Sequence, residues 1–331
     1  MRSLSAPSFW WRPRPGPLAL ALAPAGAVYG AVTGRRMSKG GASVGVPVVC
    51  VGNLVVGGAG KTPTVLELAR QLLAAGQEPA FVSRGYGGAA AARPIRVDPE
   101  RHRACDVGDE PLLLARVAPC FVAHNRVAAA RAAVADGATI ILMDDGLQTP
   151  SLAKHLSLAV VDGAVGIGNG LCLPAGPLRA PLRQQWPAVD LVVVVGAGAA
   201  GEVLADEAVS WEKAVLRAII APEPRALGRF AGRRLLAFSG IGRPGKFFAT
   251  LTKAGLDVVE TIAFPDHHPF DARDRDRLAA AAVAADATLV TTEKDRVRLP
   301  RDFPVEVLPI RLEFDDPEIL AERLGGLISQ A

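Results

Sequence analysis

The segment with the clearest chemical meaning is Gly57–Thr62, which follows an apolar run over Val46–Val51 and precedes a stretch of helical composition. Glycines in such a loop let backbone N–H groups close around phosphate oxygens at a helix N-terminus, whose dipole favours anions. In this pattern Lys61 reaches the terminal phosphates of a nucleotide, and the hydroxyl of Thr62 holds Mg²⁺. We therefore interpret the segment as a P-loop that binds a nucleoside triphosphate; the alternative is a glycine-rich turn before a helix.

The loop departs from the usual P-loop at two positions. The glycine expected five positions before Gly60 is Val55, although the Gly57-Gly58 pair can supply the missing turn. Val56 stands where dimerising switch ATPases of the Gly-Gly-x-Gly-Lys-Thr type carry a lysine. The residues that we expect to bind the nucleotide here are Val55, Val56, Gly57, Gly58, Ala59, Gly60, Lys61 and Thr62.

A pair of carboxylates forms the second part of the predicted site. Asp144 and Asp145 end an apolar run over Thr139–Met143, and P-loop proteins place the carboxylate of the metal side at such a strand end. Adjacent side chains project to opposite sides of a strand, so the two acids are not expected to do the same work. We assign both to the metal side; the alternative is that they are ordinary cap or turn residues.

The acceptor side of a transfer reaction needs other residues, because a P-loop specifies a nucleotide and not a reaction. Asp109 follows Gly108 at a predicted helix start, where it could take the proton of an attacking hydroxyl. Its alternative role is that of a plain helix cap. His267 and His268 lie in a loop flanked by prolines, and a histidine there could orient a carboxylate or raise its basicity. The alternatives are a surface loop and a fortuitous metal site.

The elements that must position these residues alternate between apolar strands and helical stretches. Strands that are apolar throughout, separated by helices, indicate a mostly parallel sheet covered on both faces, so the predicted class is α/β of the P-loop NTPase type. A second alternation begins after Pro222–Pro224. We therefore expect an N-terminal segment over 1–40, a P-loop domain over 41–228 and a smaller α/β domain over 229–331.

The N-terminal segment is apolar from about Leu18 to Val32, with aromatic residues before it and Arg35 and Arg36 after it. Prolines, among them Pro24, interrupt it, so we expect it to fall short of the roughly 20 residues that a spanning helix needs. Aromatic and basic flanks favour a helix in the membrane interface. A helix packed in the core, a signal peptide and a membrane span are the alternatives.

Composition narrows the class of protein further. The 37 basic and 33 acidic residues give a net charge of only +4, and the basic residues form no stripe of the kind that nucleic-acid binders carry. We therefore expect no nucleic-acid partner. The four cysteines stand far apart with no CxxC pair, which argues against a disulfide framework and a structural zinc site and favours a reducing compartment.

Taken in order, these motifs resemble those of the tetraacyldisaccharide 4'-kinases, the lipid A 4'-kinases of bacteria that build lipopolysaccharide. The similarity runs through nearly the whole chain; each motif alone is weak, whereas the ordered set is specific. The segments that carry it are Phe9-Trp10, Gly52-Asn53, Gly57–Pro63, Ser83–Gly87, Gly108–Pro111, Asp144–Gln148, Leu173–Arg179, Gly240–Pro244, Asp266–His268 and Thr292–Asp295.

The resemblance implies a membrane-associated kinase that uses ATP and Mg²⁺ to phosphorylate the 4'-hydroxyl of a disaccharide 1-phosphate precursor of lipid A. It implies that Lys61 and Thr62 hold phosphates and metal, that Asp109 is the general base and that His267 assists it from the second domain. Arg126 resembles an arginine that contacts anions in this family. The resemblance also implies that the protein acts at the cytoplasmic face of the inner membrane and needs no obligate protein partner.

Two positions depart from the pattern of this family. Gln148 is followed by Thr149 instead of histidine, and Arg179 is followed by Ala180 instead of glutamate. A contact with the substrate or the nucleotide is therefore in question at each of them. Two other functions stay open from the residues alone: a switch ATPase that acts through protein partners, against which Val56 counts, and a soluble kinase for a small metabolite.

Overall fold

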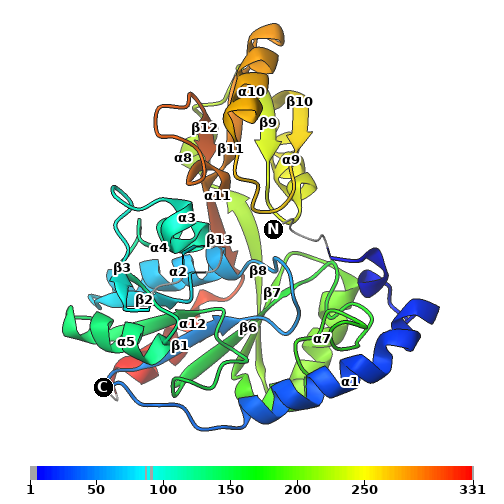
Figure 1. Cartoon of the computed structure of the whole chain (residues 1–331), viewed down its shortest axis with the longest axis vertical. Coiled ribbons are helices and arrows are strands. Elements are labelled where there is room, and N and C mark those ends of the chain that lie inside the picture. The colour runs from blue at the N-terminus through cyan, green and yellow to red at the C-terminus, as the bar shows by residue number, and fades with distance from the viewer. Residues whose placement is uncertain (1–5, 86–87, 90–91, 330–331) are drawn as a thin grey trace.

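The chain folds around two sheets, seen one above the other in Figure 1. The structure is a computed structural model that describes residues 6–85, 88–89 and 92–329. In that part of the chain the large sheet has nine strands in the order β13-β8-β7-β6-β1-β5-β2-β4-β3. Its strands are β1 (Val48–Gly52), β2 (Pro79–Ser83), β3 (Ile95–Arg96), β4 (Cys120–Val122), β5 (Ile140–Asp144), β6 (Leu156–Asp162), β7 (Leu191–Val195), β8 (Ala214–Pro222) and β13 (Ile310–Phe314).

The large sheet is parallel except at its two edges, where β3 pairs antiparallel with β4 and β13 pairs antiparallel with β8. Every residue of β1, β2, β5, β6 and β7 is buried. These strands have no solvent face, which is why their sequences are apolar almost throughout instead of alternating. The α/β class and the parallel sheet predicted from the sequence are confirmed.

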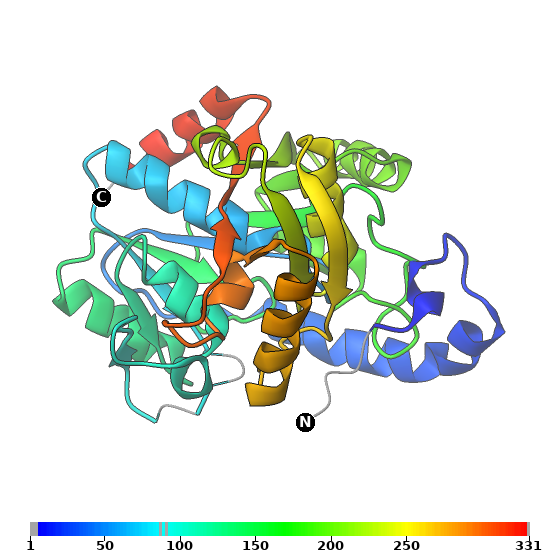
Figure 2. The ribbon, with the colours of Figure 1, turned by 90° about the horizontal axis from the view of Figure 1, so that it is seen from above.

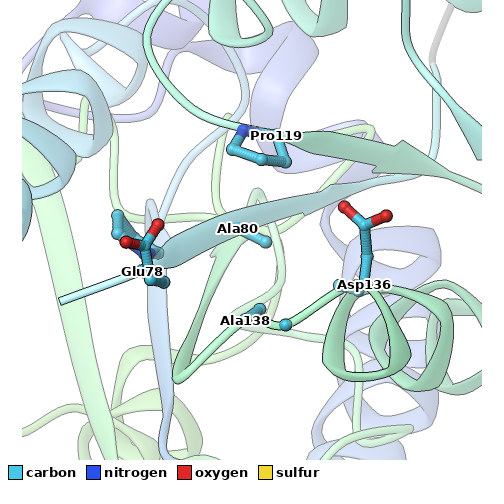
Figure 3. A pocket seen from close by; sticks show the side chains of 8 residues that line it. Glu78, Ala80, Pro119, Asp136 and Ala138 are labelled. Atoms are coloured by element: carbon cyan, nitrogen blue, oxygen red, sulfur yellow. The ribbon is translucent and has the colours of Figure 1, made fainter.

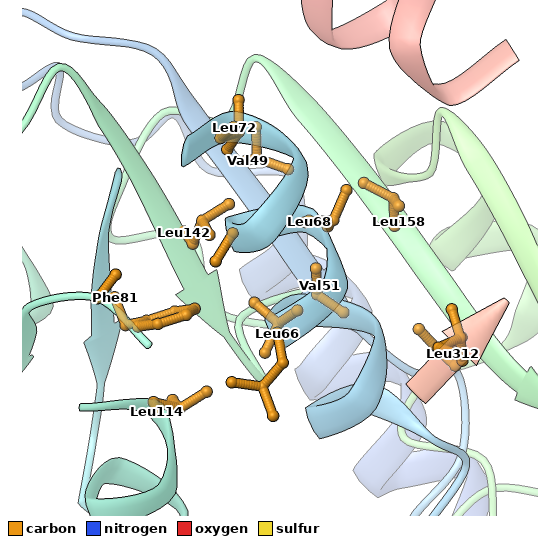
Figure 4. Packing of buried hydrophobic residues seen from close by; sticks show 14 of the residues in the cluster. Val49, Val51, Leu66, Leu68, Leu72, Phe81, Leu114, Leu142, Leu158 and Leu312 are labelled. Atoms are coloured by element: carbon orange, nitrogen blue, oxygen red, sulfur yellow. The ribbon is translucent and has the colours of Figure 1, made fainter. Parts of the chain in front are cut away.

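Helices cover both faces of the large sheet. Figure 4 shows α2 (Lys61–Ala74) lying across one face, where Leu66, Leu68 and Leu72 pack among strand residues in one apolar cluster. On the other face α5 (Arg126–Ala135) and α7 (Ala199–Ser210) bury their alanines and leucines in two further clusters. Shorter helices of this unit are η1 (Ser8–Trp11), α3 (Ala104–Val107), α4 (Asp109–Leu114), α6 (Leu182–Gln185) and η2 (Trp186–Ala188).

The smaller unit is a second parallel sheet, with strand order β10-β9-β11-β12. Two apolar clusters, one on each side of this sheet, contain Phe230 and Phe247 in one case and Phe238 and Phe270 in the other. Its elements are α8 (Pro224–Leu227), β9 (Arg234–Ser239), α9 (Pro244–Lys253), β10 (Asp257–Ala263), α10 (Ala272–Ala284), β11 (Thr288–Thr292), α11 (Glu293–Arg296) and β12 (Glu306–Leu308).

The C-terminal segment does not stay in the smaller unit, so the expected domain over 229–331 needs a correction. β13 joins the large sheet beside β8, and α12 (Pro317–Ile328) buries Leu320 and Leu324 in the cluster around α2. The apolar stretch over 305–312 is divided between two strands, β12 and β13, which belong to different sheets. The chain therefore enters the smaller unit along β8 and returns along β13.

The N-terminal helix α1 (Pro17–Met37) is longer than expected, with 21 residues and Pro24 inside it. Pro24 is on the exposed side, where the carbonyl that loses its hydrogen bond can face water. By length and composition this helix could cross a membrane, and 22% of the relevant stretch is buried. The expectation that the segment is too short to span is therefore wrong. Figure 2 shows α1 along the outside of the large unit.

A stripe of glycines holds α1 against the large unit. A β-carbon on Gly26 would lie 2.7 Å from the carbonyl oxygen of Cys172, and one on Gly30 would lie 2.8 Å from the Sγ of Cys172. A β-carbon on Gly34 would lie only 1.5 Å from the Oε1 of Gln184. Larger residues would push the helix away, so the glycines fix which face of α1 turns inward.

Candidate active site

The predicted P-loop joins the carboxyl end of β1 to the N-terminus of α2. Gly57 and Gly60 adopt φ angles of 113° and 98°, which side chains with a β-carbon rarely tolerate. Asn53 Nδ2 donates a hydrogen bond of 3.1 Å to the carbonyl oxygen of Gly57 and so pins the loop from below. The strand–loop–helix context that the sequence predicted is present, with Lys61 as the first residue of the helix.

The two unusual valines of the loop lie against the segment that ends at Arg179. Val55 is buried and forms a bridge with Leu178, and the backbone N–H of Val56 donates to the carbonyl oxygen of Pro177 at 2.9 Å. Arg179 Nε donates to the carbonyl oxygen of Val55 at 3.3 Å. These contacts stabilise the P-loop at the positions where a standard P-loop has a glycine turn.

Lys61 and Asp145 meet at the mouth of the P-loop. Lys61 Nζ lies 3.8 Å from Asp145 Oδ1, and Arg179 Nη2 donates to Asp145 Oδ2 at 3.1 Å. Burial raises the pKa of Asp145, but the charges of Lys61 and Arg179 outweigh this effect and hold the pKa below its usual value. Asp145 is therefore ionised, and it links the P-loop lysine to the end of the neighbouring strand.

Asp144 lies beside this group at the end of β5, only 2% exposed. Burial and the nearby carboxylates of Glu110 and Asp145 together raise the pKa of Asp144 to about 7, against the opposing charges of Lys61 and Arg126. Asp144 Oδ1 and Asp145 Oδ1 are buried without a hydrogen-bond partner in the described part of the chain. Oxygen atoms left unpaired in this way are suitable ligands for a hard cation such as Mg²⁺, so the residues present fit the metal predicted from the sequence.

Asp109 and His267 come together although they belong to different units. The Asp109 Oδ2 atom lies 2.9 Å from Nδ1 of His267, and Asp109 Oδ1 accepts a hydrogen bond of 2.9 Å from the backbone N–H of Glu110. Asp109 begins α4, and its side chain is 6% exposed. His268 instead contacts Asp274 at 2.6 Å within the smaller unit. The structure thus assigns the two neighbouring histidines to different partners.

Two cationic side chains of the smaller unit, those of Arg298 and Lys294, contact Asp109 and its neighbour Glu110. Arg298 contacts Asp109 Oδ2 through Nε at 2.9 Å and through Nη2 at 2.8 Å, and Lys294 Nζ donates to Glu110 Oε1 at 3.0 Å. Burial raises the pKa of Asp109, but the hydrogen bond from His267 and the charges of Lys294 and Arg298 together bring it well below its usual value. The carboxylate is held in its charged form.

Arg126 follows the cap residue of α5, Asn125, whose Oδ1 accepts from two backbone N–H groups. Arg126 Nη2 donates to the carbonyl oxygen of Asp145, and its Nη1 donates to the hydroxyl of Thr149, both at 3.1 Å. Arg126 therefore holds the loop after β5 in place, and Thr149 supplies an acceptor for it. A contact of Arg126 with a bound anion stays a prediction.

Three residues of this site were missed as candidates in the sequence: Arg179, Lys294 and Arg298. The motif Leu173–Arg179 was noted, but nothing in it indicates contact with Asp145, which lies 34 positions earlier. Arg298 stands three positions after Asp295, a spacing that often gives an ion pair on one helix face, and this pair is present at 3.1 Å. Of the motif around Ser83, Tyr86 and Gly87 lie outside the described residues.

A small hollow elsewhere on the molecule also carries two carboxylates. Figure 3 shows Glu78 and Asp136 on its sides, with Ala80, Pro119 and Ala138 between them. These residues stand at the amino ends of β2, β4 and β5, at the edge of the sheet opposite the P-loop. Asp136 is paired with Arg96 at 3.0 Å. The hollow is therefore separate from the candidate active site.

Comparisons with known proteins agree with the geometry. The sequence pattern of the LpxK family, tetraacyldisaccharide-1-P 4'-kinase, matches residues 18–329. A tetraacyldisaccharide 4'-kinase from Methylobacterium nodulans is 55% identical over 98% of this chain and 96% of its own length. Another from Bradyrhizobium sp. is 49% identical, again over 98% of this chain and 96% of its own length.

A solved structure has the same fold. The crystal structure of the apo form of LpxK from Aquifex aeolicus in complex with ATP is similar, with a TM-score of 0.76 and 24% sequence identity. The similarity covers 94% of this chain and 99% of that one. With the family pattern over residues 18–329 and relatives of this similarity over nearly the full length, the chain belongs to the tetraacyldisaccharide-1-P 4'-kinase family.

Proposed function

We propose that this chain transfers the γ-phosphate of ATP to the 4'-hydroxyl of a tetraacyldisaccharide 1-phosphate, the lipid A precursor. The observation that carries the proposal is the pairing of Asp109 with His267 at 2.9 Å in a chain that matches this family over residues 18–329. The pair supplies a proton acceptor, and the P-loop supplies a donor site. The P-loop follows β1 of the large sheet, and the pair joins the start of α4 to the loop after β10 of the smaller sheet.

On the donor side, Gly57–Gly60 would enclose the phosphates through their backbone N–H groups, and Lys61 would neutralise charge on the terminal phosphates. Thr62, Asp144 and Asp145 would hold Mg²⁺ together with the nucleotide. When bound, the metal supplies charge neutralisation of the phosphate oxygens. The two carboxylate oxygens without hydrogen-bond partners in the described part of the chain, one on Asp144 and one on Asp145, support this assignment.

On the acceptor side, Asp109 would accept the proton of the attacking 4'-hydroxyl, and His267 would fix the orientation of the carboxylate. Its low pKa makes Asp109 a weak base that is always ionised at neutral pH. Phosphoryl transfer tolerates a weak base, because its loose transition state needs positioning and charge neutralisation more than early removal of the proton. Because Asp109 and His267 come from different units, the acceptor would enter between the two units.

The helix α1 would bring the protein to the membrane that holds the lipid substrate. The side of this helix that faces away from the large unit is apolar, and Arg35 and Arg36 follow in its last turn, where they can meet anionic headgroups. An exposed apolar face of this kind marks a site of contact with a membrane. The large exposed apolar residues on it are Leu18, Leu20, Val28, Tyr29 and Val32. We place the protein at the cytoplasmic face of the inner membrane, with the lipid and the membrane surface as its partners and neither nucleic acid nor an obligate protein partner.

We also propose three working parts of the chain: the membrane segment over 1–40, the P-loop unit from 41 to 222 together with 310–329, and the smaller unit over 223–309, which begins a few residues before the boundary at 228 expected from the sequence. Separate expression of the smaller unit would test the division.

Incubation of the intact protein with ATP, Mg²⁺ and tetraacyldisaccharide 1-phosphate in detergent tests the function. We expect a product with one additional phosphate and one ADP released for each product formed. ATP hydrolysis without a phosphorylated lipid would instead support a switch ATPase. Activity on small soluble alcohols, with no preference for the lipid, would support a metabolite kinase.

A further inference from the structure

We propose that Arg298 is a positioning residue that holds Asp109 and His267 in their relative geometry when the two units meet. The proposal rests on the proposed function, because it assigns Arg298 a role in the same proton transfer. Arg298 is 4% exposed and belongs to the smaller unit, whereas Asp109, 6% exposed, belongs to the large unit. A buried arginine of one unit thus contacts the candidate base of the other.

The guanidinium group of Arg298 contacts Asp109 directly and is linked to His267 through a carbonyl oxygen that both residues share. Nε and Nη2 contact Asp109 Oδ2, and Nη1 donates to the carbonyl oxygen of Gly240 at 2.8 Å. That same carbonyl oxygen accepts the backbone N–H of His267 at 3.0 Å. Displacement of Arg298 would therefore release the Asp109 carboxylate and loosen the loop that carries His267.

A buried carboxylate, that of Asp295, fixes the guanidinium group of Arg298. Its Nη1 contacts Asp295 Oδ1 at 3.1 Å, and Asp295 is fully buried. The other oxygen of Asp295 accepts the hydroxyl groups of Ser239 and Thr292, each at 2.7 Å. A guanidinium group fixed in this way gives the carboxylate one hydrogen bond from Nε and a second close charge contact from Nη2, an arrangement that the single point charge of an ammonium group cannot reproduce.

Arg298 also contributes to the charge around Asp109. The cations that face the carboxylate are Arg298 and Lys294, the latter paired with Glu110, and the titratable neighbour is His267 with Asp266 behind it. Removing the charge of Arg298 would raise the pKa of Asp109 toward its ordinary value. A residue that only stabilised the fold would leave the pH dependence of turnover unchanged.

The test compares Arg298→Gln and Arg298→Lys with the control Arg301→Gln. Arg301 also reaches from the smaller unit to a carboxylate of the large unit, Glu100, but both side chains are more than half exposed. We expect Arg298→Gln to lower kcat about 10- to 100-fold, to leave the KM for ATP unchanged and to move the acid limb of the kcat profile to higher pH. Arg298→Lys should keep the acid limb in place and still lose about tenfold in kcat. Arg301→Gln should match the wild type in all three.

Asp109→Asn, measured in the same series, separates this proposal from the proposed function. If neither the wild type nor any variant phosphorylates the lipid, the proposed function fails, and if Asp109→Asn keeps wild-type turnover, the role of Asp109 as the base fails. If Asp109→Asn is inactive while Arg298→Gln has the kcat and pH profile of the wild type, the role of Arg298 is refuted and the proposed function stands. Should Arg298→Gln not fold, as judged by circular dichroism, Arg298→Lys decides: an unchanged kcat refutes the proposal, and a lower kcat at unchanged KM for ATP supports it.

Discussion

The carboxylate of Asp109 and the imidazole of His267 lie 2.9 Å apart, although 158 positions separate them in the chain. Asp109 is held by the first turn of α4 in the large unit, and His267 is held by a loop of the smaller unit. Because neither unit contains both groups, the pair exists only while the units are together. Under the proposed mechanism, the arrangement of the two units is therefore a condition for proton transfer.

Replacement of the candidate base should separate chemistry from nucleotide binding. We expect Asp109→Ala to lower turnover by about two to four decades and to leave the Kd for ATP within about twofold, because Asp109 does not contact the P-loop. Turnover is measured with the lipid acceptor, and ATP binding is measured by calorimetry. Asp206→Ala, an exposed acid on α7, is the matched control. Unchanged turnover in Asp109→Ala would remove this residue from the mechanism.

Replacement of the P-loop lysine should affect both properties. Lys61 contacts Asp145 and points to the mouth of the loop, so Lys61→Ala removes charge from the phosphate site and from the metal side together. We expect weaker ATP binding and lower turnover, each by about tenfold or more. Lys253→Ala, an exposed lysine at the end of α9, serves as control. Full ATP affinity in Lys61→Ala would contradict the assignment of this loop.

The ion pair between Asp109 and Arg298 should make stability depend on pH in a defined window. The pKa of Asp109 is lower in the folded state than its unfolded value of about 3.9. The stabilisation is therefore complete above the unfolded pKa and is lost as the pH falls through the folded pKa. We expect Asp109→Asn to reduce the free energy of unfolding by about 3 kcal/mol at neutral pH.

Denaturant titrations of the wild type and Asp109→Asn at several pH values test that window. The difference between the two free energies of unfolding should be constant between roughly pH 5 and 8 and should shrink below about pH 4, because asparagine does not titrate. A difference that grows as the pH falls would have the wrong sign.

The exposed apolar face of α1 should decide membrane binding. We expect Leu20→Asp together with Val28→Asp to weaken binding to vesicles of anionic phospholipid at least tenfold, because both side chains are more than half exposed on that face. Val283→Asp, an exposed valine on α10 with 82% exposure, is the control and should bind like the wild type. Sedimentation with vesicles measures the effect. Equal binding of all three proteins would place the lipid contact elsewhere.

Most of the fold could be predicted because the strands of the large sheet are buried on both faces. Such strands are continuous apolar runs, as the sequences of β2 (Pro79–Ser83) and β7 (Leu191–Val195) show. The return of β13 to the large sheet could not be predicted. It depends on pairing with β8, some 90 positions earlier (Ile310 with Pro222), and apolar periodicity carries no information about partners.

Part of the candidate site could likewise be predicted from local sequence, and part of it could not. Gly57–Thr62 and Asp144 are placed by local sequence, because a loop after a buried strand lies at the carboxyl edge of the sheet whatever the rest of the chain does. The pairing of Asp109 with His267 came from resemblance to a family, since neither residue alone is distinguishable from a cap or a surface histidine. Arg298 has no local signal beyond its spacing from Asp295. Its role depends on how two sheets face each other, which the structure shows.

The central claim is that the P-loop and the Asp109–His267 pair act together on one hydroxyl group. A single-turnover reaction with γ-labelled ATP tests it most directly, with tetraacyldisaccharide 1-phosphate and its 4'-deoxy analogue as the two acceptors. The account predicts label on the first acceptor, at the 4' oxygen, and none on the second. Label on the 4'-deoxy analogue, or release of labelled phosphate with neither acceptor modified, would contradict it.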